Sequence, residues 1–226
     1  MCFSAGASFT AGILLTAVGV ATLKKVSKPA QLVFASIPIF FALQQFAEGV
    51  LWLTLRNPGY PGLQGVTTQM FIVMAQVIWP AMIPVSVLLL EEKGTRRKVL
   101  LALFFAGLYV ALSNLYGLAV YPVHVLISSR HLVYQNDLHA GFGKIGLALY
   151  FAVTVIPLLV SGVRRMYVLG IIMALSFTVS AVFYMECLTS VWCFFAAVIS
   201  FIIYFIVRDL SEKRPGRRAI SPGPAR

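Results

Sequence analysis

Apolar residues follow one another along this chain in long, nearly unbroken runs, without the strict alternation that a half-buried strand would show. A helix needs about 20 apolar residues to cross the roughly 30 Å of hydrocarbon in a bilayer. The pattern predicts seven such helices, approximately over 4–23, 31–55, 68–90, 98–120, 138–161, 166–186 and 190–207. We therefore expect an all-α polytopic membrane protein, with a seven-helix transmembrane domain over 1–207.

The basic residues between these runs predict an orientation, because cytoplasmic connections carry an excess of Lys and Arg. One set of alternate connections is poor in cations and holds only Arg56, Arg130 and the nearby Lys144. The amino terminus is therefore expected outside the cell (inner) membrane, and residues 208–226 form a basic, disordered cytoplasmic tail. The cations of the opposite set and the tail are Lys24, Lys25, Lys28, Lys93, Arg96, Arg97, Lys98, Arg164, Arg165, Arg208, Lys213, Arg214, Arg217, Arg218 and Arg226.

Composition supports a membrane protein. The chain is 60% hydrophobic and 11% charged, whereas soluble domains are about 45–50% apolar and about 25% charged. Its net charge of +11 would raise the question of nucleic acid in a soluble protein. Here the cations lie at the expected cytoplasmic surface, so the partner that we expect is the lipid bilayer, with no nucleic acid.

The second run contains an acidic side chain in an apolar helix. Gln44 and Gln45 precede Glu48 by about one helical turn. A carboxylate at that depth costs on the order of 2.5–3.5 kcal/mol on insertion scales, so Glu48 should face the bundle interior. Two interpretations follow, an ion pair with Lys144 or a site that binds a cation or a proton; Lys144 could instead extend to the membrane surface.

Other polar residues fall in the same, outer half of the predicted bundle. Pro80 and Pro84 would free helix carbonyls that neighbouring groups must satisfy again. Ser8, Gly12, Thr16 and Gly19 lie near one face of the first helix and favour its close packing. The remaining pattern predicts an outward-facing polar pocket, although polar groups in membrane helices often only hold helices together. Its candidate ligand-binding residues are Glu48, Gln44, Gln45, Gln76, Trp79, Asn114, His139, Lys144 and Glu186.

The cysteines and histidines offer an alternative chemistry on the outer side. Cys2 and Cys187 could form a disulfide in an oxidising compartment, or remain thiols. A metal site built from Cys2, His139, Glu186 and Cys187 is the alternative, but no CxxC or HxxxH spacing is present, and no metal is the primary expectation. The stretches VHVLI and HLVYQ flank SSR and predict a hairpin with His124 opposite Tyr134.

The segments MCFSAGASF, QQFAEG, WP and SVWCFFAA resemble an uncharacterised family of small bacterial seven-helix membrane proteins that begin Met-Cys-Phe-Ser-Ala. The resemblance covers most of the chain and implies the architecture, but it implies no activity. The residues that carry it are Cys2, Gln44, Gln45, Glu48, Trp79, Pro80, Trp192 and Cys193.

Three functions remain open from the sequence. The first is a binding protein that senses or carries a small molecule or ion from the outer side. The second is an intramembrane lipid-processing enzyme, with Glu48 or His139 as general base. The third is a structural subunit that has a membrane-protein partner. Neither a catalytic residue nor a cofactor is assigned by the pattern, because the last run has no Schiff-base lysine and the chain has no GxSxG motif.

Overall fold

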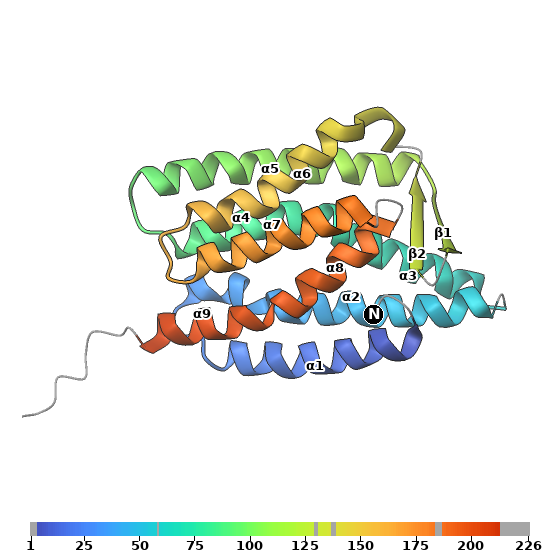
Figure 1. The fold of residues 1–226 in the computed structure, drawn as a ribbon, viewed down its shortest axis with the longest axis horizontal. Helices are drawn as coiled ribbons and strands as arrows, with labels where there is room; N and C mark the ends of the chain where they lie inside the picture. Colours follow the sequence, from blue (N-terminus) through green and yellow to red (C-terminus); the bar gives the residue numbers. More distant parts are fainter. Residues whose placement is uncertain (1–3, 58, 129–130, 137–138, 184–186, 213–226) are drawn as a thin grey trace, which may run out of the picture.

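A computed structural model describes residues 4–57, 59–128, 131–136, 139–183 and 187–212, which are mostly helical (Figure 1). In chain order the elements are α1 (Ala5–Leu23), η1 (Pro29–Gln31), α2 (Leu32–Arg56), α3 (Pro61–Val73), η2 (Met74–Ile78), α4 (Trp79–Leu90), α5 (Thr95–Val120), β1 (Val123–Ser128), β2 (His131–Asn136), α6 (His139–Val160), α7 (Met166–Phe183), α8 (Leu188–Ile199) and α9 (Phe201–Glu212).

Within the described ranges, six helices are long and apolar enough to cross a membrane. They are Ala5–Leu23, Pro29–Arg56, Pro61–Leu90, Thr95–Val120, Met166–Phe183 and Leu188–Glu212. The predicted run over 138–161 contributes a shorter apolar helix, Ile145–Val160. Its length is limited by Gly143, whose φ of 43° and ψ of −135° interrupt the helical geometry.

The two ends of the bundle differ in chemistry. Connections 24–28, 91–94 and 161–165 lie together at the left end in Figure 1, with the end of α9. These connections contain six of the cations that the sequence pattern assigned to one side, and we call this the basic end; the six are Lys24, Lys25, Lys28, Lys93, Arg164 and Arg165. The opposite end, the hairpin end, carries β1 and β2 together with the connection between α2 and α3.

Helices α1 and α2 pack closely through small residues. Ser8, Gly12 and Gly19 are buried on α1. A Cβ atom on Gly12 would lie 2.9 Å from the Phe46 ring, and one on Gly19 would lie 2.4 Å from the Ile39 side chain. The predicted close packing of the first helix is therefore confirmed, and Thr16, which is only half-buried, satisfies its hydroxyl on the Gly12 carbonyl at 2.8 Å.

A π-helical turn, η2, joins α3 to α4 directly before Pro80. Because proline has no N–H to donate, the carbonyls at this turn receive hydrogen bonds from other helices. Asn114 Nδ2 donates to the Gln76 carbonyl at 2.8 Å, and the Tyr150 hydroxyl donates to the Ala75 carbonyl. Gly107 of α5 lets that helix approach, since a Cβ there would lie 2.1 Å from the Pro80 carbonyl oxygen.

The predicted hairpin is present, but its predicted register is wrong by one residue. His124 lies opposite Gln135, and Val125 lies opposite Tyr134. Ser128 pairs with His131, so the turn is one residue shorter than the SSR segment and every partner shifts.

The hairpin covers the ends of α2 and α3. Val125 and Leu132 form a buried cluster with Leu51 and Trp52 of α2. Tyr134 stacks on Phe71 of α3, with 4.7 Å between the ring centroids. This end of the bundle is therefore closed above α2 by apolar and aromatic side chains.

The ends of two predicted helices differ from the structure. The last predicted run ended at 207, but α9 continues to Glu212, with a break at Ser200 between α8 and α9. Ion pairs stabilise the added turn, from Arg165 to Asp209 at 3.3 Å and from Arg208 to Glu212 at 3.6 Å. The third run begins earlier than expected, because Pro61 starts α3 as its first helical residue.

Candidate functional site

Glu48 lies in the interior, as its cost of insertion predicted, and its side chain is 0% exposed. Ser190 of α8 donates a hydrogen bond of 2.6 Å to one carboxylate oxygen, and Ser8 of α1 donates one of 3.4 Å to the other. The carboxylate thus joins three helices. Hydrogen bonds to an ionised group are stronger than neutral ones, which helps to offset the cost of burying it.

Gln44 forms hydrogen bonds through both atoms of its side-chain amide. Its Nε2 donates to Cys193 Sγ at 3.2 Å, and its Oε1 accepts from Trp79 Nε1 at 2.9 Å. Trp79 in turn stacks on Phe41, with 4.0 Å between the ring centroids. The structure therefore brings together three residues that carry the family resemblance, Gln44, Trp79 and Cys193.

Gln45 differs from its neighbour. Its side chain is 0% exposed, and neither amide atom has a hydrogen-bond partner within the described part of the chain. The same holds for the indole N–H of Trp52, which is 1% exposed. Gln45, Glu48 and Trp52 are spaced to share one face of α2. A buried polar group without a partner costs about 1–3 kcal/mol. A water molecule or a ligand that bonds to these groups would therefore stabilise the folded protein.

The Asn114 side chain contacts Gln76 through the Gln76 backbone. Asn114 holds the π-helical turn by donating to the main-chain oxygen of Gln76, which is a structural role. The side-chain Oε1 of Gln76 is buried and has no hydrogen-bond donor among the described residues. π-helical turns are frequent at functional sites, so this turn adds to the interest of the region.

Several predicted residues lie outside what the structure describes. These are Cys2 and Glu186, together with the side chains of His139 and Lys144. The predicted Glu48–Lys144 ion pair and the alternative metal site therefore stay predictions. Cys187 is described and is buried. The described residues contain no group of three His, Cys, Asp or Glu side chains placed to hold a metal ion.

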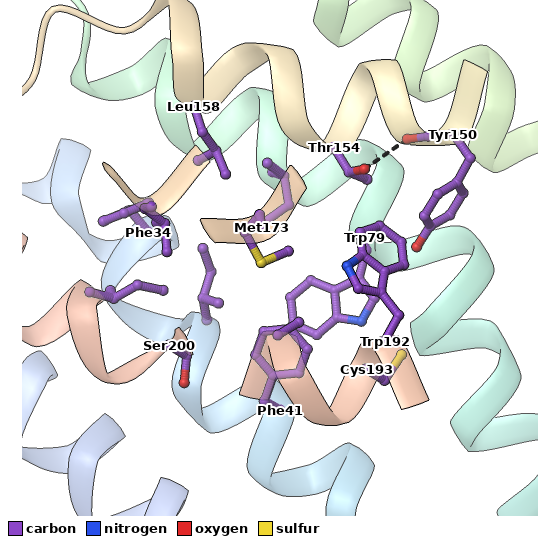
Figure 2. Close-up of a pocket in the computed structure, with 15 residues that line it drawn as sticks. Phe34, Phe41, Trp79, Tyr150, Thr154, Leu158, Met173, Trp192, Cys193 and Ser200 are labelled. Carbon is purple, nitrogen blue, oxygen red and sulfur yellow. Dashed lines mark hydrogen bonds between the residues drawn. The ribbon is translucent and has the colours of Figure 1, made fainter. Parts of the chain in front are cut away.

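A cavity of about 40 Å³ is lined by Trp79 and Cys193, the two side chains that bond to Gln44 (Figure 2). Its wall is almost entirely apolar and aromatic, with Phe41, Trp79, Met173 and Trp192 among its lining residues. Of the predicted ligand-binding residues whose side chains are described, Trp79 alone lines it. The cavity therefore differs in character from the polar pocket expected from the sequence.

The sequence pattern missed three contributors to this region: Ser190, Tyr150 and the role of Ser8 as a donor to Glu48. Ser8 was recognised only as a small packing residue. Ser190 and Tyr150 act on helices far away in sequence, and spacing within a single helix carries no signal for such contacts. The likeness around SVWCFFAA, which begins at Ser190, was the nearest available sign.

The fold is that of a mostly helical protein whose six long apolar helices are compatible with a multi-pass membrane protein. The model of a family of unknown function, DUF6629, matches residues 1–219, so the chain belongs to that family. No curated protein and no solved structure matches the chain.

Proposed function

We propose that this protein binds a small cation or a protonated small molecule at the polar face of α2 formed by Gln45, Glu48 and Trp52, as a sensor or carrier. The observation that carries the proposal is the Gln45 amide, which is fully buried and has no hydrogen-bond partner among the described residues. A polar side chain of this kind is stabilised when a ligand supplies the missing partners.

The chemistry of this face favours a positively charged ligand with N–H or O–H donors. Glu48 supplies a carboxylate that the Ser8 and Ser190 hydroxyls orient from two sides. Gln45 adds an amide oxygen, the type of neutral acceptor that coordinates cations and bonds to ammonium groups. Gln44 is already committed to Trp79 and Cys193 and acts by positioning.

The proposed setting is a bacterial inner membrane, with seven spans and the amino terminus outside. The separation of cations between alternate connections supports this orientation, and Figure 1 draws those connections at one end of the bundle. Six spans are the long apolar helices, and α6 would supply the remaining one, the fifth in chain order, with Ile145–Val160 and the residues before it. In this orientation the ligand approaches from the hairpin end, and β1 and β2, which cover the end of α2, have to move aside to admit it.

Native mass spectrometry of the full chain, released from its membrane in mild detergent, tests this proposal. The native protein is expected to carry an added mass that is lost in Gln45→Leu and in Glu48→Gln. Gln69→Leu is the matched control, because it makes the same change at an exposed position of α3 and should retain the added mass.

A bare chain in every preparation, or an added mass that survives both Gln45→Leu and Glu48→Gln, would contradict the proposal. Lipid turnover that stops in Glu48→Gln would favour the intramembrane enzyme instead. Co-purification of a second, unrelated chain in stoichiometric amount would favour the structural subunit.

A further inference from the structure

Two connections at the basic end are fastened to each other by one carboxylate. Glu91, directly after α4, accepts hydrogen bonds from the Ser161 hydroxyl at 3.1 Å and from the Gly162 N–H at 3.0 Å. Arg97 of α5 donates to the Leu88 and Glu91 carbonyls at 3.2 and 3.0 Å. The connection between α4 and α5 is therefore held against the connection between α6 and α7 (Figure 1).

This junction brings arginines from both sides to the surface of the basic end. Arg96 of α5 lies against Gly162, since a Cβ atom on that glycine would lie 2.4 Å from Arg96 Nη1 and 2.8 Å from Glu91 Oε1. Arg164 follows two residues after Gly162 and is exposed. Neither arginine has an ion-pair partner among the described residues. Both guanidinium groups are therefore available to an anion from outside the chain.

The electrostatics of this surface favour such an anion. Residues 91–98 and 161–165 together carry six cations and two carboxylates. The first turn of α5 contains no acidic residue, and Gly94, which precedes it, supplies no side-chain acceptor. The positive end of the helix dipole therefore adds to the positive charge of the arginines, and a bound anion would offset both.

An exposed apolar face continues from this surface along α7. Tyr167, Ile171 and Leu175 are all exposed, and their spacing places them on one side of the helix. This face begins three residues after Arg164. A phosphate group at the arginines would therefore have an apolar surface beside it for attached hydrocarbon chains. A lipid has both parts, whereas a free phosphate ion and an acidic peptide lack the hydrocarbon.

We propose that Arg96 and Arg164 bind the phosphate of an anionic phospholipid whose chains lie along the Tyr167 face of α7. A guanidinium group binds a phosphate through two parallel hydrogen bonds, which a lysine does not reproduce. Gly162 and Glu91 position Arg96 for this contact. The site lies at the end of the long apolar helices, where lipid headgroups lie in either orientation of the chain. The lipid site is therefore independent of the cation site proposed on α2.

Native mass spectrometry of the full chain in mild detergent tests this site with two lipids that have the same chains, dioleoyl phosphatidylglycerol and dioleoyl phosphatidylcholine. Both contain a phosphate, but only phosphatidylglycerol has a net negative charge. The native protein is expected to bind phosphatidylglycerol more tightly by roughly 5-fold or more, since one cation at an anionic lipid surface contributes about a factor of five. Equal affinity for the two lipids would overturn the inference.

Arg96→Gln and Arg164→Gln should each lower the affinity for phosphatidylglycerol by about 5-fold. Lys98→Gln is the matched control and should lower it much less. Lys98 is exposed in the same turn of α5, but two residues along a helix place it on a different side from Arg96. Diffuse attraction to the whole basic end predicts equal losses in all three variants, and that outcome would overturn the inference. Gln45→Leu should keep the lipid, so failure of this site and failure of the proposed cation site are distinguishable.

Gly162→Ala tests the positioning of Arg96 without removing a charge. The added methyl group would displace Arg96 Nη1, so the affinity for phosphatidylglycerol should fall. Gly65→Ala on α3 is the control, because a Cβ atom there meets nothing within 4 Å, and it should leave the affinity unchanged. Undiminished affinity in Gly162→Ala would contradict the proposed position of Arg96.

Two further outcomes would replace the lipid with another ligand. Inorganic phosphate at the same concentration as the lipid should not displace phosphatidylglycerol, because it lacks hydrocarbon chains. Displacement by phosphate would make this a site for the free ion. An acidic protein that co-purifies with the native chain and is lost in both Arg96→Gln and Arg164→Gln would assign the surface to a protein partner. Either result would overturn the inference.

Discussion

Two faces of α2 lie side by side and differ in how their polar groups are used. Along one face, Phe34, Ile37 and Phe41 line the apolar cavity, and Gln44 continues the stripe with both amide atoms bonded. Along the other, Gln45 is equally buried, but neither of its amide atoms is bonded within the described chain. The contrast separates a polar group that holds the fold together from a polar group that has no partner in the described chain and that we propose binds a ligand.

The largest effect is expected at the carboxylate of Glu48. Ser190→Ala removes a 2.6 Å hydrogen bond to this buried group and should lower the free energy of unfolding by about 1.5–3 kcal/mol. Ser176→Ala is the control, because Ser176 is buried and its hydroxyl donates within its own helix, to the Met173 carbonyl. Unfolding in mixed detergent micelles measures the free energy of unfolding of both variants. Equal losses would show that the Ser190 hydrogen bond to Glu48 adds no more stability than one within a single helix.

Packing on the cavity side should depend on whether a position lines the empty space. Ala35→Val adds volume at a fully buried position outside the cavity and should cost about 1–3 kcal/mol of stability. Ala196→Val adds the same volume toward the cavity and should cost less. The same unfolding measurement checks this pair, and the reverse order would mean that the cavity is filled by other side chains.

The two neighbouring glutamines should respond with opposite signs. Gln44→Leu leaves the buried Trp79 indole N–H without its acceptor and should destabilise the ligand-free protein by about 1–2 kcal/mol. Gln45→Leu removes an unbonded amide, so ligand-free stability should stay the same or rise. Measured on ligand-free protein, a large loss in Gln45→Leu would show that this amide is bonded inside the protein.

The smallest effect concerns pH at the hairpin. Burial lowers the pKa of His131 below its usual value of 6.5, so the folded protein favours the neutral ring. Between the lowered pKa and the unfolded value, the unfolded chain binds more protons, and stability falls as pH falls through this range. Thermal unfolding at pH 7.5 and below pH 6.5 should show this loss, and His131→Gln should reduce it. If stability depends on pH equally strongly in His131→Gln, other groups cause the loss.

The sequence was informative wherever a contact follows from spacing along one helix. The spacing of Ser8, Gly12, Thr16 and Gly19 predicted close packing, which holds at the two glycines, although Thr16 is only half-buried. Pro80 predicted freed carbonyls, which Asn114 and Tyr150 now satisfy. The burial of Glu48 followed from the cost of exposing a carboxylate to lipid. Each of these inferences needs only local geometry.

Features that depend on how helices meet were not predictable from the pattern. The pairing of Ser190 with Glu48 joins positions 142 residues apart, and nothing in either helix identifies the other. The cavity arises where several helices fail to fill space, which depends on side-chain shapes across all of them. The hairpin register failed by one residue because turn length, not strand composition, decides it.

The most direct test of the account is an experimental density map of the full chain in a lipid nanodisc, at a resolution that shows ordered ligands. The account predicts non-protein density within hydrogen-bond distance of the Gln45 amide and facing Glu48, and its loss in Gln45→Leu. A Gln45 side chain bonded to other protein groups, or a site that holds only water in every preparation, would contradict it.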